Sequence, residues 1–252
     1  MSRRFSRLAG TVALSCAALL AVPATASADP APVGVDAVSQ AAAEAIASTR
    51  TEVAEPTDGN PLAALDAVNK ILTDFGITPF FYPTAAVNCA AAPGAPLGIV
   101  PGVAGGAAGP WPNIAPIPGL PALNAVEKGE TMFAFVPAGI VNDSGDKSGM
   151  QVAWFNVNTF QGGFADFGGA TATLVDSVLN NLDVLPAVKD LVRGPLTEAL
   201  NVLPAAGARA VPVETGTGTV LAAVFGTVNH KAVDGSDKSC FFFPTVGLVN
   251  VA

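Results

Sequence analysis

Hydrophobic residues recur at helical spacing near the N-terminus. Asn60-Pro61 has the form of a helix cap followed by proline at the first helical position, and Gly76 is a typical helix stop. One stripe of the intervening helix collects the apolar residues Leu62, Leu65, Val68, Ile71, Leu72 and Phe75. An earlier, Ala-rich helix is expected over residues 37–48. We therefore predict an acidic helical segment over residues 29–76.

A second helical pattern covers residues 174–203. Apolar residues repeat every three or four positions, charged residues fall between them, and Pro186, Pro195 and Pro204 punctuate the stretch. This predicts two or three short amphipathic helices inserted between strands. Packing on a sheet face is the ordinary role of such helices, and a lid over an apolar cavity is the alternative.

Most of the remaining chain is typical of strands. The candidates are rich in Val, Phe, Thr and Trp and are separated by Gly, Asp and Ser: 80–89, 131–137, 150–160, 208–215, 217–229 and 240–251. In the third, Val152 and Trp154 share one face while Phe155 and Val157 share the other. That arrangement predicts a strand covered on both sides, or one with a bulge near Asn156.

Residues 90–126 contain no charged residue, and 15 of these 37 positions are Gly or Pro. Because proline removes hydrogen-bond donors and glycine disfavours helix, this stretch cannot be a membrane helix. We predict an apolar loop laid over the core or in contact with a lipid or partner. The candidate apolar contacts of the loop and the insert are Trp111, Ile114, Ile117, Leu120, Leu179 and Leu182.

The N-terminal residues have the composition of a targeting segment. Residues 1–28 carry three arginines, then an apolar run from Ala9 to Val22, then a small-residue cleavage pattern that ends at Ala28. This predicts a secretory signal peptide; the run is too short for a membrane anchor. Ser6 replaces the large apolar residue usual in twin-arginine signals, so the general secretory route is favoured. We expect a secreted or envelope-located mature chain without a transmembrane span.

Removal of the signal leaves 9 basic and 20 acidic residues, a net charge of −11. Such an acidic chain lacks the basic surface that binds DNA or RNA. Two cysteines remain, Cys89 and Cys240, and in an oxidising compartment we predict that they form a disulfide. A tryptophan on an inner strand together with a disulfide between distant strands favours an immunoglobulin-like antiparallel β-sandwich. The predicted fold is thus mainly β, with this domain over residues 77–252.

The sequence holds few signs of catalysis. His230 is the only histidine, no serine lies in a Gly-x-Ser-x-Gly elbow, and Gly216-Thr-Gly-Thr lacks the rest of a phosphate-binding loop. The similar loops 141–148 and 233–239 could offer acidic oxygens to calcium, but turn chemistry explains their composition and we interpret both as hairpin connections. We therefore predict no enzymatic activity, no cofactor and no metal.

Several segments carry a resemblance to a known family. Tyr82-Pro-Thr before Cys89, the run Met150-Gln-Val-Ala-Trp-Phe-Asn-Val-Asn-Thr, Gly216-Thr-Gly-Thr-Val-Leu-Ala-Ala-Val and the Cys240–Pro244 ending resemble uncharacterised secreted, Ala/Pro-rich proteins of mycolate-containing actinobacteria. The resemblance runs from Phe80 to the C-terminus and implies location at or near the envelope.

Export, the cysteine pair and the missing catalytic groups predict a non-enzymatic, exported binding or structural module. Its expected partner is an envelope lipid or another envelope component. A carrier of a hydrophobic envelope lipid is the alternative, and a secreted hydrolase that acts through carboxylates or His230 is a third. Whether residues 90–126 and 174–203 enclose a pocket distinguishes the first two hypotheses.

Overall fold

The computed structural model describes residues 62–87, 89, 92, 98–112, 123–200 and 207–252. The predicted signal peptide and the predicted helix over residues 37–48 lie outside them. The elements in chain order are α2 (Leu62–Asp74), β1 (Thr78–Pro79), β2 (Thr84–Ala86), β3 (Val100–Ala108), β4 (Glu130–Pro137), β5 (Met150–Asn156), β6 (Gly162–Asp166), β7 (Gly168–Gly169), α3 (Ala170–Asn181), α4 (Pro186–Leu200), β8 (Arg209–Glu214), β9 (Gly218–Lys231) and β10 (Asp237–Val251).

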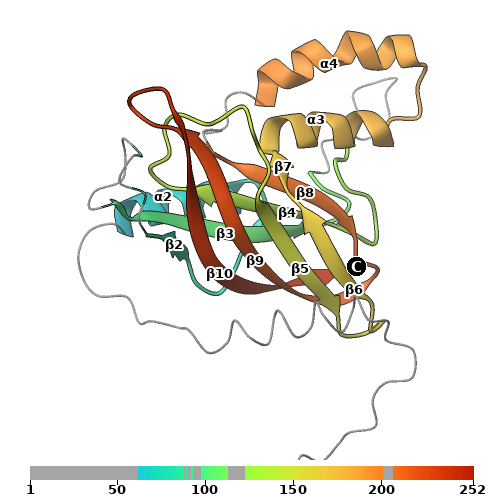
Figure 1. Ribbon diagram of the computed structural model, residues 1–252. Coiled ribbons are helices and arrows are strands. Elements are labelled where there is room, and N and C mark those ends of the chain that lie inside the picture. Colours follow the sequence, from blue (N-terminus) through green and yellow to red (C-terminus); the bar gives the residue numbers. More distant parts are fainter. Residues whose placement is uncertain (1–61, 88, 90–91, 93–97, 113–122, 201–206) are drawn as a thin grey trace, which may run out of the picture. The chain divides into compact units, whose positions relative to one another are not determined.

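All the strands in the described ranges belong to one antiparallel sheet (Figure 1). Its order is β6-β5-β9-β10-β2-β3-β4-β8-β7, with β1 paired to β3. The sheet curves until β6 and β8 approach each other, so it is nearly closed. The mainly β, antiparallel prediction is confirmed. The immunoglobulin-like sandwich is not confirmed, because the strands form one continuous sheet in place of two facing ones.

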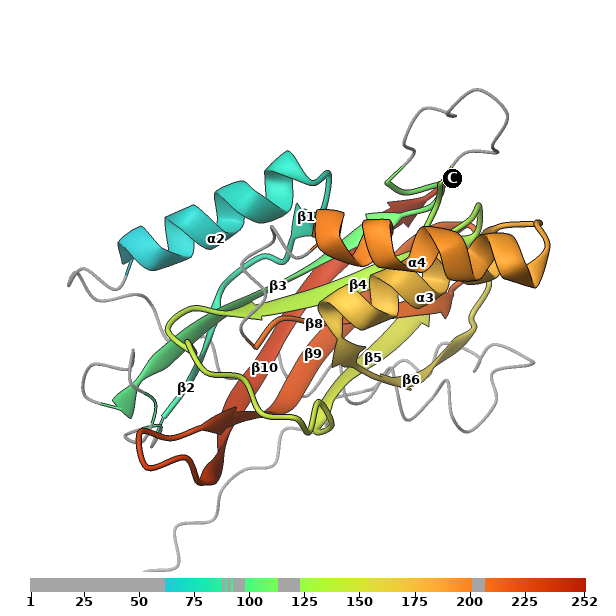
Figure 2. The ribbon, with the colours of Figure 1, turned by 90° about the horizontal axis from the view of Figure 1, so that it is seen from above.

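The two sides of the sheet contact different parts of the protein. Along β4, Phe133 and Phe135 belong to the core that the sheet encloses, whereas Met132 and Ala134 belong to a second cluster shared with the helices. This alternation follows from the two-residue period of a strand. Trp154 lies in the enclosed core, as predicted for an inner strand. Helices α2, α3 and α4 cover the outer side of β3, β4 and β8 (Figure 2).

The prediction of a loop over residues 90–126 is wrong for residues 100–108. These residues form β3, an interior strand between β2 and β4. Its glycines make room for neighbouring side chains. A Cβ atom on Gly102 would lie 2.7 Å from the ring of Phe135, and one on Gly106 would lie 2.5 Å from Val249. Glycine in this strand thus reflects close approach by large side chains, not a flexible connection.

The helices match their predicted stop signals in part. Gly76, with φ of 71°, ends α2, and the amides of Gly76 and Ile77 donate to the carbonyls of Thr73 and Leu72 in a Schellman arrangement. The insert forms two helices, and α4 continues through Pro195, which the sequence pattern treats as a break. None of the described helices is long and apolar enough to cross a membrane.

The predicted Cys89–Cys240 disulfide is confirmed. It joins residues 151 positions apart, with their Cα atoms 5.4 Å from each other, and both cysteines are buried in the enclosed core. Beside it, Thr84 of β2 donates a hydrogen bond to the carbonyl of Phe243 in β10. The bridge therefore fixes the chain that precedes β3 against β10.

Candidate functional site

A pocket of about 360 Å³ lies between the outer side of the sheet and the helices. Met132, Ala134 and Val136 of β4 and Ala210 of β8 line it from the sheet. Because Met132 and Val136 are four residues apart on a strand, this wall is about 13 Å long. The volume is more than twice the roughly 150 Å³ of a cavity that binds benzene, and it falls within the range of natural small-molecule sites.

The helices supply the facing walls of the pocket. Leu174 and Val178 come from α3, and Leu196 and Leu200 come from α4. Each pair is four residues apart, so each presents one face of its helix. Leu72 of α2 completes this apolar lining. The helical insert thus covers an apolar cavity as well as packing on the sheet.

Trp111 lies at the pocket and belongs to the predicted apolar segment 90–126. Its indole Nε1 donates a hydrogen bond to the carbonyl of Phe75 at 2.6 Å, just after α2. Its backbone amide donates to Val126 at 3.0 Å, and its carbonyl accepts from Ala125 at 2.7 Å. These bonds hold the ring against the C-terminal end of α2 and leave its apolar surface toward the cavity.

Few polar side chains reach this pocket. Asp74 is exposed at its margin and forms an ion pair with Lys70 at 2.7 Å. Thr171, at the start of α3, also lines it. Arg209 is a lining residue, but its side chain is fully buried and its guanidinium binds Asp143. Within the described part of the chain, the pocket therefore presents hydrocarbon to a ligand over most of its wall.

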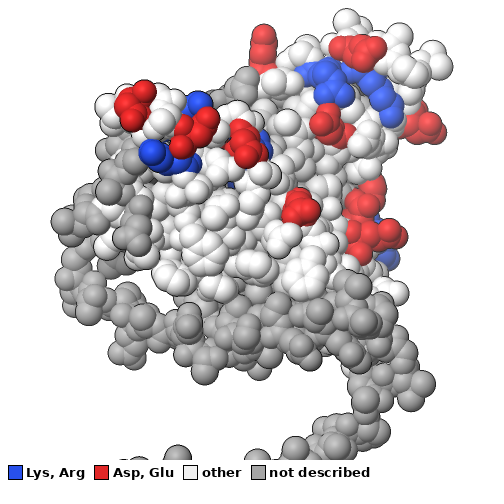
Figure 3. Space-filling model, viewed as in Figure 1, with Lys and Arg blue, Asp and Glu red and all other residues white. Residues whose placement is uncertain are grey.

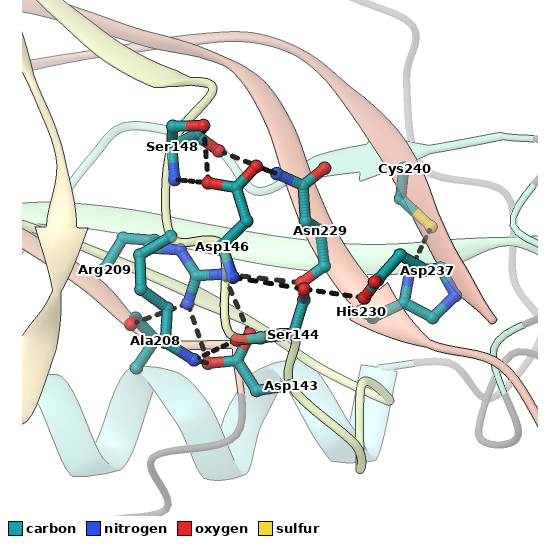
Figure 4. Close-up of polar contacts among 11 residues, drawn as sticks. Asp143, Ser144, Asp146, Ser148, Ala208, Arg209, Asn229, His230, Asp237 and Cys240 are labelled. Atoms are coloured by element: carbon teal, nitrogen blue, oxygen red, sulfur yellow. Dashed lines mark hydrogen bonds and ion pairs between the residues drawn. The ribbon is translucent and has the colours of Figure 1, made fainter. Parts of the chain in front are cut away.

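A separate polar network closes one end of the sheet (Figure 4). The Arg209 guanidinium donates to both carboxylate oxygens of Asp143, at 2.9 and 3.0 Å. Lys147 also donates to Asp143, at 2.5 Å. Ser144 in the same loop donates to Asp237 at 2.8 Å, which joins the loop 141–148 to the start of β10. The two loops that resemble each other in sequence therefore lie side by side.

The two loops differ in topology. Residues 233–239 include the tight turn between the paired strands β9 and β10, as predicted. Residues 141–148 lie between β4 and β5, which are not neighbours in the sheet, so their hairpin interpretation is wrong. This connection crosses the end of the sheet, and Asp143 forms an isolated bridge with His230 of β9. The buried ion pair secures that crossing.

The pKa values of Asp143 in this network and of His230 beside it both lie below their ordinary values. Burial by itself raises the pKa of Asp143, but its hydrogen bonds and charge interactions with Arg209 and Lys147 outweigh burial and hold the pKa below its ordinary value. Burial lowers the pKa of His230, despite a backbone hydrogen bond at Val228 that acts in the opposite direction. His230 Nδ1 lies 3.7 Å from the sulfur of Cys240. The only histidine is therefore part of the enclosed core beside the disulfide, away from the pocket lining.

The predicted apolar contacts have different positions in the structure. Trp111 lines the pocket, and Ile114, Ile117 and Leu120 lie outside the described residues. Leu179 and Leu182 are buried in the adjoining core cluster but are not lining residues.

Sequence reasoning missed the wall from β4 and the Arg209–Asp143 pair. An arginine between Ala208 and Ala210 in a strand is the one sequence signal that could have indicated the pair. The alternation of pocket and core residues in β4 gave no comparable signal, because residues 132–137 are all apolar. Comparison with protein families, with curated proteins and with solved structures finds no match to this chain.

Proposed function

We propose that the protein is an exported, non-enzymatic binding module that holds the hydrocarbon part of an envelope lipid in this pocket. The observation that carries the proposal is that Trp111 from the apolar segment and Leu174, Val178, Leu196 and Leu200 from the insert line one cavity. These two segments hold much of the unusual apolar content of the chain. Their convergence on a cavity supports the hypothesis of a lipid carrier over that of a purely structural module.

The size of the pocket sets the class of ligand. Scaled from the cavity that binds benzene, it accepts about 14 carbon atoms. Burial of about ten methylene groups at ~0.8 kcal/mol each supplies ~8 kcal/mol, which corresponds to a micromolar dissociation constant before the cost of association. A ligand that inserts one acyl or isoprenoid chain and leaves its polar part in water fits these limits.

We also propose that the protein has no enzymatic activity. Asp74 is already paired with Lys70, and the single histidine is packed against the disulfide. The hydrolase hypothesis requires a nucleophile or paired acids in an open cleft. The mainly apolar lining favours retention of a ligand over its chemical conversion.

The protein contains two tryptophans, which permits a direct test. Trp154→Phe leaves Trp111 as the only indole, and Trp111→Phe leaves Trp154 in the enclosed core. The probe is 12-bromododecanol, whose bromine quenches tryptophan fluorescence on contact. We expect saturable quenching in the Trp154→Phe variant and little quenching in the Trp111→Phe variant.

A second pair of variants separates pocket filling from general destabilisation. Ala134→Leu places extra volume in the pocket, whereas Ala85→Leu adds the same atoms on a partly buried position of β2 outside it. The first should weaken binding at least tenfold and the second should not. Equal quenching of both tryptophans, or unchanged affinity in Ala134→Leu, would contradict the proposal.

A further inference from the structure

We propose that the protein self-associates as a two-fold symmetric dimer through an aromatic face on the outer side of β6, β5, β9 and β10. This face comprises Phe155, Phe160, Phe164, Phe225, Phe241 and Phe243 together with the small cluster Ala153, Ala223 and Val246. It lies on strands that none of the described helices covers. The inference is independent of the pocket and of the ligand proposed for it.

The register of the strands makes this face continuous. Ala153 of β5 pairs with Phe164 of β6 on one side and with Ala223 of β9 on the other. Ala223 in turn pairs with Val246 of β10. The ring centroids of Phe155 and Phe160 are 6.4 Å apart, and those of Phe241 and Phe243 are 5.8 Å apart. Aromatic pairs thus lie near both lateral margins of an apolar centre.

The exposed area of the face is large for a monomer. Phe160, Phe164, Phe241 and Phe243 are 42% to 49% exposed, and the adjoining Phe81 is 67% exposed. At ~200 Å² per phenylalanine, these five side chains leave about 500 Å² in water. The half-buried Phe155, Leu221 and Phe225 extend the patch. The total approaches the ~800 Å² that each partner contributes to a standard interface, whereas monomers rarely expose more than a few hundred.

The distribution of charge permits a second copy of the chain as the occupant. The mature sequence has a net charge of −11, so self-association requires a face on which these charges do not oppose each other. Figure 3 shows few charged side chains on the described part of the front surface: one acidic side chain lies there, and the others gather near α3 and α4, near the turn between β9 and β10 and at the right-hand edge. Asp166 of β6 and the ion-paired Asp237 lie at its margins.

The alternatives fit less well. A bilayer with anionic head groups needs an excess of basic residues around the apolar patch, whereas the margins carry acids beside Lys231 and Lys238. The shape of a sheet suits a second sheet, because two sheets stack about 10 Å apart with interleaved side chains. In a two-fold symmetric dimer, both copies would use this aromatic face, so the face of one copy would contact the same face of the other.

Sedimentation equilibrium of the mature chain, residues 29–252, from 0.1 to 100 μM tests the proposal. We expect twice the chain mass at the upper concentrations and persistence of the dimer in 1 M NaCl, since an apolar interface is insensitive to screening. Phe164→Lys combined with Phe241→Lys should raise the dimer dissociation constant at least about 100-fold, because hot-spot losses count twice in a symmetric interface. Leu191→Lys, at a 77% exposed leucine on α4, is the matched control and should not change it.

Several results would overturn the proposal. A wild-type chain that stays monomeric to 100 μM would do so. Flotation of that monomer with phosphatidylcholine vesicles would assign the face to a lipid surface. Dissociation by Leu191→Lys to the same extent would place the interface elsewhere. If circular dichroism shows the lysine variants unfolded, Phe164→Ala with Phe241→Ala decides the same question.

Discussion

Replacement of Asp143 by asparagine tests the importance of the buried ion pair at the end of the sheet. The side chain of Arg209 is 0% exposed, and Asp143 binds it at 2.9 and 3.0 Å while also facing Lys147. The asparagine side chain would keep the shape and one oxygen acceptor but would remove the charge. A buried cation that loses its partner costs about 3 to 5 kcal/mol. Because one hydrogen bond survives, we expect a loss of about 3 kcal/mol.

The partner substitution gives the second arm of a double-mutant cycle. Arg209→Met removes the buried charge but leaves Asp143 with Lys147 and with partial access to water, since its side chain is 16% exposed. This variant should lose less stability than Asp143→Asn, about 1 to 2 kcal/mol. The double variant should be more stable than the sum of the two losses predicts, because neither charge is then left alone.

Urea unfolding at pH 7, with the disulfide intact and followed by far-ultraviolet circular dichroism, measures these differences. The matched control is Asp176→Asn, which breaks a half-exposed pair with Arg193 at 2.7 Å and should cost less than about 1 kcal/mol. Because the folded pKa of Asp143 lies below its ordinary value, its stabilising contribution is complete above the unfolded pKa and is lost as pH falls through the folded pKa. Equal stability of Asp143→Asn and Asp176→Asn would refute this reasoning.

Three further predictions use the core. Burial lowers the pKa of His230, so the unfolded chain binds the proton more tightly than the folded chain does. The free energy of unfolding should therefore fall between about pH 7 and pH 5 in wild type. It should not fall in this way in His230→Gln, and urea midpoints measured at both pH values check the difference. Replacing Cys89 and Cys240 by serine should cost up to about 5 kcal/mol for a loop of 151 residues, measurable by calorimetry; a loss below about 1 kcal/mol would contradict this. Gly102→Ala should cost about 1 to 3 kcal/mol against the ring of Phe135, whereas Gly145→Ala, with nothing within 4 Å, should cost little; equal melting temperatures would disprove the close-approach argument.

The sequence predicts local elements better than their partners. Pro61 and Gly76 delimit α2 closely, and strands β4, β8, β9 and β10 fall near their predicted ranges, because capping and β-propensity act locally. Strand β3 was not predicted, because its glycines are needed to make room for Phe135 and Val249, which are distant in sequence. The sandwich inference fails for a related reason: Trp154 and a distant disulfide are compatible with any sheet that encloses a core.

The pocket could be predicted only in part. Apolar residues of α3 form one broad stripe, and the sequence does not say which of them face packed neighbours and which face a cavity. Leu174 and Val178 line the cavity as well as contacting the packed cluster, whereas Leu179 belongs to the cluster alone. That difference depends on how the helix is rotated against the sheet, which non-local packing decides.

The position of β10 in the sheet has a consequence for the order in which the protein can be assembled. Strands β6, β5 and β9 lie on one side of β10, and β2, β3, β4 and β8 lie on the other. As the chain emerges from a ribosome or a translocation channel, every other described strand appears before residues 237–251 do. The two halves of the sheet can therefore be joined only when that segment is free, and until then the strand edges that β10 will cover are open to pairing with other chains.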